Sequence, residues 1–314
     1  SARSCMGWAR RRPPHSALQS KVRDASDQAG MLYPMYVVPL SYALSLTPHE
    51  GILPHQALVE RGIARRWDGQ ARVLFCSHAR CSSQHPDPTF KQFSALQGAL
   101  RDLARGETST GAAHPYSMMG HLIGRTGEEW AELLNDPATA VWYDYWSISQ
   151  VSFRKDAATL QKLVDAVNSL HLYVAASAFV MVVVPTVPHA QASVGALPGH
   201  GYCDEAYWLD RAWCRLEALS DFLTQSMLPG FGFPVPAMRV SEGRASGVEF
   251  MMANSVLRPV GTGNLTVEAD RARLYGPVHN LLEQCMARFL EQVRDAEAEV
   301  EAGRGGTAQV EAGR

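Results

Sequence analysis

Arg72-Val73-Leu74-Phe75-Cys76 is a short, almost wholly apolar run that ends in the polar residues Ser77-His78-Ala79-Arg80. A continuous apolar run of this length is typical of a strand buried on both faces of a parallel sheet. In such sheets, ligands bind beyond the carboxyl ends of the strands. The run therefore predicts a central strand, and the polar residues after it are candidates for a binding site.

Further β-prone runs follow along the chain. Ala140 to Trp146 is aromatic and breaks at the polar stretch Ser147 to Gln150, which predicts a second strand of this kind. Phe179 to Val184 predicts a third strand. Tyr36 to Val38 and Val248 to Met252 are weaker candidates for short strands.

Between these runs, apolar residues recur with the spacing of amphipathic helices. Thr89 and Gln92 predict a capping box at the start of a helix that ends near Leu103. Other expected features are a capping box at Thr47 to Glu50, and helices near Glu128 to Leu134, after an Asp156 cap, from Tyr207 to about Phe222, and from Leu274 to Phe289. The alternation of strands and helices predicts a doubly wound α/β domain.

The two ends of the chain differ in composition from the middle. Residues 1–30 carry six Lys or Arg against two Asp, and residues 291–314 repeat Val-Glu-Ala-Gly-Arg. Both ends are expected to be disordered. We divide the chain into a basic segment 1–30, a packed lead-in 31–70, an α/β domain 71–290 with insertions at 104–139 and 186–206, and a low-complexity tail 291–314.

Composition excludes several classes of partner. A formal net charge of -2, from 29 basic and 31 acidic residues, gives no electrostatic reason to expect nucleic acid or an anionic membrane. Apolar runs are far shorter than the roughly 20 residues of a membrane-spanning helix. Six cysteines without Cys-x-x-Cys spacing do not suggest a disulfide scaffold, so we expect a reduced, cytoplasmic setting.

One cluster has the composition of a metal site. Cys76, His78, Cys81 and His85 lie within ten residues and are ligand types that zinc prefers. However, Cys76 ends a buried strand, where a free cysteine is commonly a small core residue. We therefore assign no metal and keep a zinc enzyme as the least favoured alternative.

The stretch Tyr207 to Glu217 places one carboxylate among aromatic residues. On a helix, Glu217 lies on the same side as Trp213 and Cys214, which are four and three positions earlier. Such a carboxylate is usually solvated or ion-paired, here with Arg211 or Arg215. It becomes a catalytic candidate if the helix brings it to the carboxyl edge of the sheet.

Taken together, these motifs resemble a Toll/interleukin-1 receptor (TIR) domain. The resemblance covers residues 71–222 and rests on the order of four motifs. They are Ser77-His78-Ala79-Arg80 after the first strand, the aromatic run into Asp144-Tyr145-Trp146-Ser147-Ile148-Ser149-Gln150, the run Phe179 to Val184, and Trp213-Cys214-Arg215-Leu216-Glu217. The extra segments at Gln84 to Pro88 and Thr108 to Pro137, and the long Thr186 to Tyr202 loop, depart from the family pattern.

The resemblance implies a flavodoxin-like, open, mainly parallel sheet with helices on both faces. It also implies self-association, or contact with other TIR-like domains, in signalling. Some branches of the family cleave NAD at the nicotinamide bond, with NAD as substrate and no cofactor required. The family's catalytic glutamate falls on Glu217, and the expected nucleotide-binding residues are Ser77, His78, Arg80, Asp144, Trp146 and Trp213.

The chemistry needs little beyond one carboxylate. Breaking an N-glycosidic bond passes through an oxocarbenium-like state that a nearby carboxylate stabilises. Trp146 or Trp213 would stack on a ring, and Arg80 or Arg154 would meet the pyrophosphate. Against this, buried tryptophans are more often core residues, and His78 suits a simple turn. An NAD glycohydrolase and a non-catalytic interaction module therefore stay open as alternatives.

Overall fold

A computed structural model describes residues 30–107, 126–150, 156–190, 201–226, 237–245, 248–251 and 258–311. The expectations for the basic segment 1–30, apart from residue 30, and for Arg154 lie outside these residues. So does much of the two predicted insertions.

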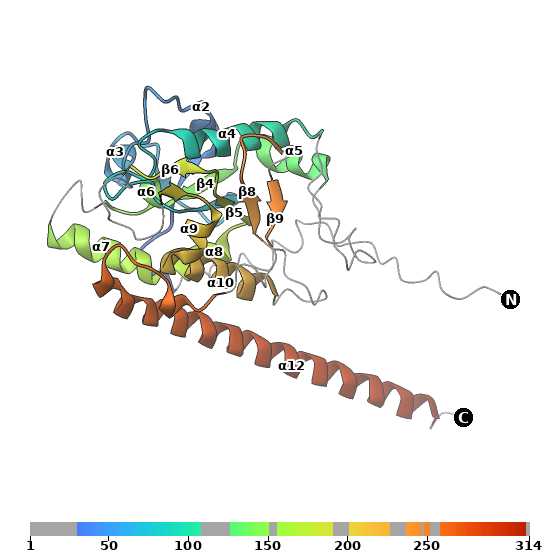
Figure 1. Cartoon of the computed structure of the whole chain (residues 1–314). Coiled ribbons are helices and arrows are strands. Elements are labelled where there is room, and N and C mark those ends of the chain that lie inside the picture. Colours follow the sequence, from blue (N-terminus) through green and yellow to red (C-terminus); the bar gives the residue numbers. More distant parts are fainter. Residues whose placement is uncertain are drawn as a thin grey trace.

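A seven-stranded sheet forms the centre of the fold, in the order β2-β1-β4-β3-β5-β8-β9 (Figure 1). The strands are β1 (Tyr36–Pro39), β2 (Arg65–Arg66), β3 (Val73–His78), β4 (Ala140–Tyr143), β5 (Phe179–Val183), β8 (Met238–Val240) and β9 (Val248–Phe250). The neighbours β4-β3-β5-β8 pair in parallel, whereas β1, β2 and β9 pair antiparallel at the edges. Numbered by their order along the chain, the parallel strands lie across the sheet as second, first, third and fourth. This is the start of the flavodoxin-like order, so the expected fold class is confirmed.

The central strand β3 explains why its sequence is continuously apolar. Phe75 is in register with Trp142 on one side and Val180 on the other, and all six residues of the strand are buried. Successive side chains point to opposite faces. Val73 and Phe75 accordingly belong to one core cluster, and Leu74 and Cys76 to the other.

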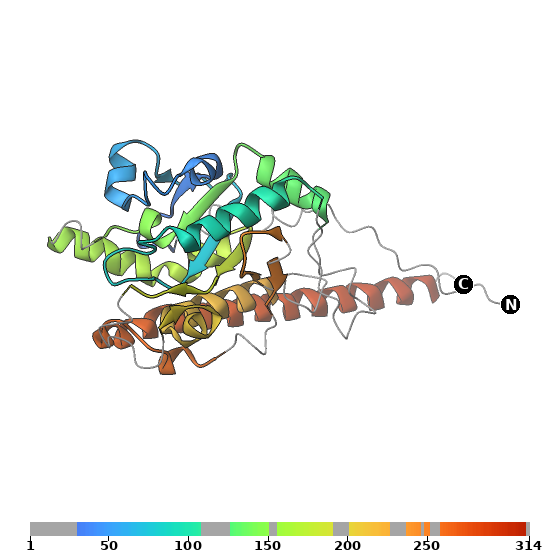
Figure 2. The ribbon, with the colours of Figure 1, turned by 45° about the horizontal axis from the view of Figure 1, so that its top comes forward.

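Helices cover both faces of the sheet (Figure 2). One face packs against α4 (Lys91–Ala104) and α5 (Gly127–Asn135), which contribute Phe93, Leu96 and Trp130 to the core. The other packs against α8 (Leu170–Ala176) and α10 (Ala212–Ser226), which contribute Tyr173 and Leu216. Helix α7 (Ala157–Asn168) begins at the predicted Asp156 cap, whose side chain accepts a hydrogen bond from the Thr159 backbone.

The lead-in 31–70 adds antiparallel strands to the sheet, together with the short helices α2 (Leu40–Ser45) and α3 (His55–Glu60). Its predicted capping box has the expected bonds. Glu50 accepts from the Thr47 backbone at 3.1 Å, and the Thr47 hydroxyl accepts from the Glu50 backbone at 3.4 Å. These bonds close a turn instead of starting a helix.

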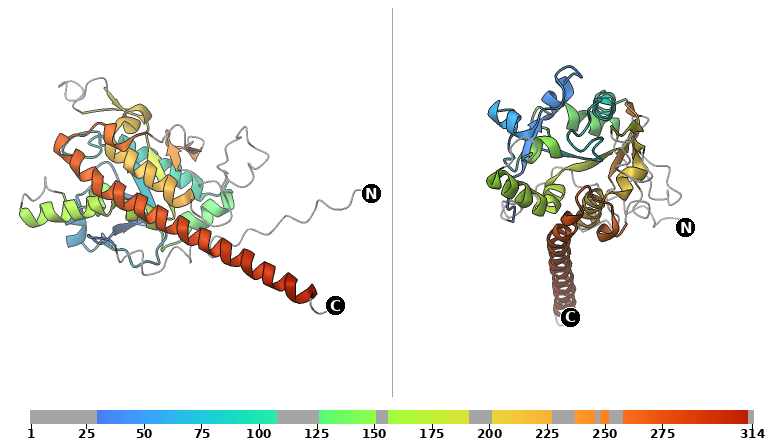
Figure 3. Two further views of the ribbon diagram at one scale, coloured as in Figure 1. Left: turned by 90° about the horizontal axis from the view of Figure 1, so that it is seen from below. Right: turned by 60° about the vertical axis from the view of Figure 1, so that its left-hand side comes forward.

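Helix α12 (Tyr275–Glu311) follows two 3-10 helices, η5 (Val260–Thr262) and η6 (Glu268–Leu274). It crosses below the sheet and extends well beyond the body of the fold in two views (Figures 1 and 3). Residues 291–311 are thus helical where the sequence favoured disorder. Among the described residues, no helix is long and apolar enough to cross a membrane.

The predicted strand over Ala140 to Trp146 is wrong in its second half, because tertiary contacts change the backbone path. β4 ends at Tyr143, and the aromatic run turns at once into the short helix α6 (Asp144–Ser147). There Trp146 packs on Phe93 and Tyr143 in the core, with ring centroids at 5.2 and 5.0 Å. No sequence pattern predicts β8, which extends the parallel set.

The start of α4 differs from the predicted capping box. Phe90 precedes the helix in a left-handed conformation, with φ of 59°. The carboxylate of Asp87 accepts from the Phe93 backbone at 2.8 Å, and the Gln92 side chain donates to the Ala79 carbonyl at 3.2 Å. The capping carboxylate is therefore supplied by the preceding Pro-flanked loop, and Thr89 does not cap the helix.

Candidate functional site

The predicted helix over Tyr207 to Phe222 is broken at Arg211 into α9 (Glu205–Asp210) and α10. Arg211 is extended, with φ of -82° and ψ of 127°. The Ala212 N–H at the start of α10 donates to the Asn264 carbonyl at 3.0 Å. The break separates Trp208 and Glu217 onto two helices, and both side chains then reach the end of β3.

Residues 259–264 brace this break from outside. The buried Arg215 donates to the Leu209 carbonyl at 2.7 Å and to the Pro259 carbonyl at 3.0 Å. It is also paired with Asp210 at 3.2 Å. A Cβ on Gly263 would lie 2.5 Å from the Ala212 Cα, so only glycine allows this segment to approach α10. Arg215 is therefore committed to the brace and does not neutralise Glu217.

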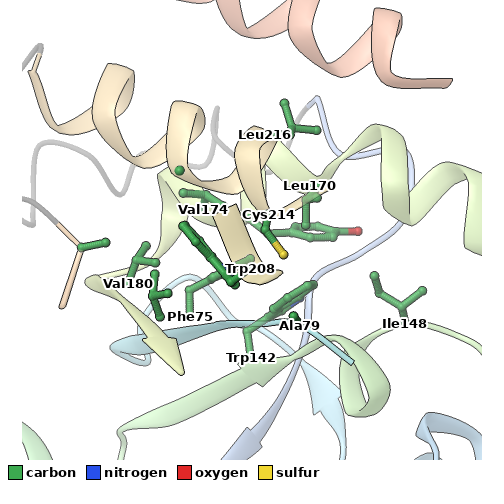
Figure 4. Packing of buried hydrophobic residues seen from close by; sticks show 14 of the residues in the cluster. Phe75, Ala79, Trp142, Ile148, Leu170, Val174, Val180, Trp208, Cys214 and Leu216 are labelled. Atoms are coloured by element: carbon green, nitrogen blue, oxygen red, sulfur yellow. The ribbon is translucent and has the colours of Figure 1, made fainter. Parts of the chain in front are cut away.

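Glu217 is buried at the carboxyl end of β3, with 9% of its surface exposed. The Ser77 hydroxyl donates to Glu217 Oε2. Ser77 also accepts a hydrogen bond from the indole Nε1 of Trp208 at 2.8 Å. Figure 4 shows Trp208 between the α10 helix and the strands that carry Phe75 and Trp142. The predicted Ser77 and Glu217 thus meet directly, and Trp208 joins them.

The surroundings of Glu217 favour its neutral form. Burial raises the pKa of Glu217 to about 8, the hydrogen bond from Ser77 lowers it, and the nearby charge of Asp144 raises it. These are the effects expected of a desolvated carboxyl close to a second carboxylate. Such perturbed groups cluster at functional sites, although structural groups show them too.

Asp144 lies at the same edge of the sheet, at the start of α6 directly after β4, and forms the second half of the site. Its carboxylate is 3.0 Å from His78 Nε2 and 3.4 Å from Arg80 Nε. Burial raises the pKa of Asp144, but Arg80 and His78 outweigh it and hold that pKa well below its ordinary value. His78 stacks on Tyr143 with ring centroids 4.2 Å apart, which fixes the imidazole against the end of β4.

Arg80 is engaged inside the protein. Besides Asp144, it donates to Gln150 Oε1 at 2.9 Å and lies 5.4 Å from the centre of the Tyr145 ring. Its side chain is one-third exposed, at 33%. It would have to exchange Asp144 or Gln150 for a phosphate before it could bind a nucleotide.

The two tryptophans proposed as ring platforms occupy other places. Trp146 has no exposed surface and belongs to the core cluster on the α4 face. Trp213 is half-buried and packs against the opposite core cluster. In this conformation Trp146 offers no face to a ligand, so the core interpretation holds for it.

The sequence pattern does not predict two further residues of the site, Trp208 and Asp221. It places Trp208 only within a helix, and no sequence signal marks the break at Arg211 that turns Trp208 toward Ser77. Asp221, one turn after Glu217 on α10, is 4% exposed. Burial raises the pKa of Asp221 to about 8, and a hydrogen bond from the Ala237 backbone lowers it. Its spacing of four from Glu217 is the one signal that could have identified it.

The four residues of the zinc alternative point to different partners. His78 is bonded to Asp144, and His85 Nε2 lies 3.1 Å from the Ile52 carbonyl oxygen. Cys76 lies in the core, and Cys81 is close to Cys203. Within the described ranges, no three His, Cys, Asp or Glu side chains converge as metal ligands.

Little of Glu217 reaches the surface, since only 9% of the residue is exposed. An open hollow of about 500 Å³ lies elsewhere, on the lead-in, where it is lined by Pro39, Ser41, Tyr42, Ser45, Gly62, Ile63 and Arg65. A ligand would contact more of Glu217 only if side chains around the end of β3 moved.

Comparisons with known proteins add no identity to this geometry. No protein-family model, no curated protein and no solved structure matches the chain.

Proposed function

We propose that this chain is a TIR-like signalling domain that acts by self-association and cleaves NAD⁺ through Glu217. The observation that carries the enzymatic part is the contact between Ser77 and Glu217 at the carboxyl end of the central parallel strand. In flavodoxin-like sheets, ligands bind at this edge, where the strand order reverses. Here the order reverses at β3, which lies between β4 and β5.

The charges of the site suit a cationic substrate. Glu217 and Asp144 are close enough for the charge of one to raise the pKa of the other. A positively charged nicotinamide ring placed between them would relieve this repulsion and favour ionised Glu217. The ring would leave as neutral nicotinamide, so no proton donor is needed.

The reaction is balanced as a hydrolysis. The bond between C1′ of the ribose and the nicotinamide nitrogen breaks, and both electrons leave with nicotinamide. Ionised Glu217 stabilises the oxocarbenium ion that is left. Water adds to C1′, and its proton passes to Glu217 or to solvent.

The direct test is to incubate the purified full chain with NAD⁺ at pH 8 and measure free nicotinamide. We expect release by the wild type and at least a hundredfold less by Glu217→Gln, which keeps the side-chain shape. Asp221→Asn is the matched control, because it neutralises the other buried carboxyl of α10 without touching Ser77. The absence of turnover in the wild type, or equal turnover in Glu217→Gln, would remove the enzymatic proposal.

Self-association is supported by a separate feature, an apolar stripe on α12. Leu282, Met286, Phe289 and Val293 are 37% to 57% exposed, and their spacing of four, three and four residues is that of a coiled-coil seam. The inner face of the same helix, with Leu281 and Cys285, packs on the body. A second copy would supply the same stripe, as the self-complementary contact of a two-fold dimer requires.

This part is tested by light scattering over a concentration series. The wild type should form dimers that the double change Met286→Glu and Phe289→Glu dissociates. Leu160→Glu on α7 changes another exposed apolar residue, 44% exposed, and should leave the dimer intact. A wild type that is monomeric at every concentration would contradict self-association and favour the alternative in which NAD⁺ cleavage is the main activity.

A further inference from the structure

The indole nitrogen, which is the only polar side-chain atom of Trp208, is hydrogen-bonded to a residue of the candidate site. Trp208 is 1% exposed, and its indole N–H donates to Ser77 Oγ at 2.8 Å. Another buried tryptophan in the same core cluster behaves differently. Trp142 is also 1% exposed, yet its indole nitrogen has no hydrogen-bond partner among the described residues.

The contact with Trp208 limits which hydrogen bonds the Ser77 hydroxyl can still make. A serine hydroxyl has one proton and two lone pairs, whereas an indole N–H can only donate. Trp208 must therefore occupy a lone pair of Ser77, and the proton of Ser77 is left for Glu217. Glu217 can accept it through a carboxylate oxygen or, when protonated, through its carbonyl oxygen.

We propose that Trp208 is a positioning residue, whose indole N–H fixes the Ser77 hydroxyl so that its proton is held on Glu217. Trp208 acts on Glu217 only through Ser77. The donated proton favours the ionised carboxylate, and a hydroxyl that itself accepts a hydrogen bond is a stronger donor. The kinetic part of the test rests on the proposed NAD⁺ cleavage, but the titration of Glu217 does not.

The experiment follows the carboxyl carbon of Glu217 by NMR across a pH series in wild type and Trp208→Phe. Phenylalanine keeps an aromatic ring and removes the N–H. The loss of one hydrogen bond should raise the titration midpoint by about half a pH unit and lower kcat/KM at pH 7 about threefold. Trp142→Phe is the matched control for packing and should move neither quantity.

A double-mutant comparison tests whether the effect passes through Ser77. In a Ser77→Ala background, Trp208→Phe should cause no further shift of the midpoint. The proposal is overturned if Trp208→Phe titrates like Trp142→Phe, or if its shift is as large without Ser77 as with it. A chain that titrates as expected but releases no nicotinamide would refute the enzymatic proposal and leave this one standing.

If Trp208→Phe does not fold, Ser77→Ala tests the same contact from the other side. The indole proton signal of Trp208 should then move to the position of a proton without an acceptor. An indole signal unchanged by the loss of Ser77 would overturn the proposal.

Discussion

Glu217 and Asp144 are two carboxyl groups at one edge of the sheet, and their surroundings shift their pKa values in opposite directions. Glu217 has a hydroxyl for a partner and burial raises its pKa to about 8. Asp144 faces Arg80 and His78, and its contacts with these two groups hold its pKa well below the ordinary value. A pair of titratable groups separated in this way is typical of acid–base sites. The comparison shows that a buried carboxyl without a cationic partner favours the neutral form, whereas an adjacent arginine outweighs the cost of burial.

The largest expected effect concerns stability above neutral pH. Because the pKa of Glu217 is raised by folding, its stabilising contribution is present at low pH and is lost as pH rises toward about 8. Asp221 behaves in the same way. Between pH 6.5 and 8, the free energy of unfolding should fall by about 3 kcal/mol in total. Urea unfolding should show that Glu217→Gln removes roughly half of this loss, and an unchanged slope would contradict the buried, neutral state of Glu217.

The next effect is the pH dependence of nicotinamide release. If ionised Glu217 is required, kcat/KM should rise about tenfold per pH unit below a midpoint near pH 8. Asp144→Asn removes a negative neighbour and should move this midpoint to lower pH. A midpoint that moves upward in Asp144→Asn would mean that the two groups are not coupled as their positions indicate.

Asp144 should have a smaller effect on stability, with the opposite pH dependence. Its lowered pKa gives a contribution that is present above about pH 4 and is lost as pH falls further. Its side chain is 31% exposed, so Asp144→Asn should cost about 1 kcal/mol at pH 7. Denaturant unfolding at pH 7 and pH 3 measures this difference, which should shrink at pH 3. An equal difference at both values would show that the cost is one of packing.

Gln150 should have the smallest effect on the site. Its side chain accepts from Arg80 Nη2 at 2.9 Å and donates to the Ile148 carbonyl at 2.7 Å and the Asp144 carbonyl at 3.4 Å. Because these bonds lie outside the contact between Ser77 and Glu217, Gln150→Ala should only lower the free energy of unfolding, by about 1 kcal/mol. The midpoint of Glu217 should stay where it is. Thermal unfolding and the same carboxyl titration would check both, and a shift of that midpoint would extend the coupled network beyond Asp144.

Much of the sheet could be predicted from sequence because buried strands leave a strong pattern. The runs around Val73, Val141 and Val180 are apolar on both faces, since each strand is covered by helices on both sides. β8 lacks such a pattern, because its three residues Met238–Val240 include an arginine paired with Glu205 at 2.7 Å. The apolar pattern that predicts the other parallel strands therefore does not predict β8.

The candidate site could be predicted from the sequence only in part. Ser77, His78 and Asp144 could be placed at one edge because parallel strands end together. Their contacts with residues of α10 could not be predicted, because the position of α10 relative to β3 is fixed by packing over the whole sheet. Trp146 was expected at the ligand, but the turn after Tyr143 directs it into the core.

The sequence by itself determined the central strands, the polar residues at their carboxyl ends and the carboxylate on a following helix, because these depend on hydrophobic pattern and order along the chain. The tertiary structure decided which of those residues meet. The brace at residues 259–264 breaks the predicted helix at Arg211, and only then can Trp208 and Glu217 share the Ser77 hydroxyl. Burial and neighbouring charge, which arise from contacts distant in sequence, then set the different pKa values of Glu217 and Asp144.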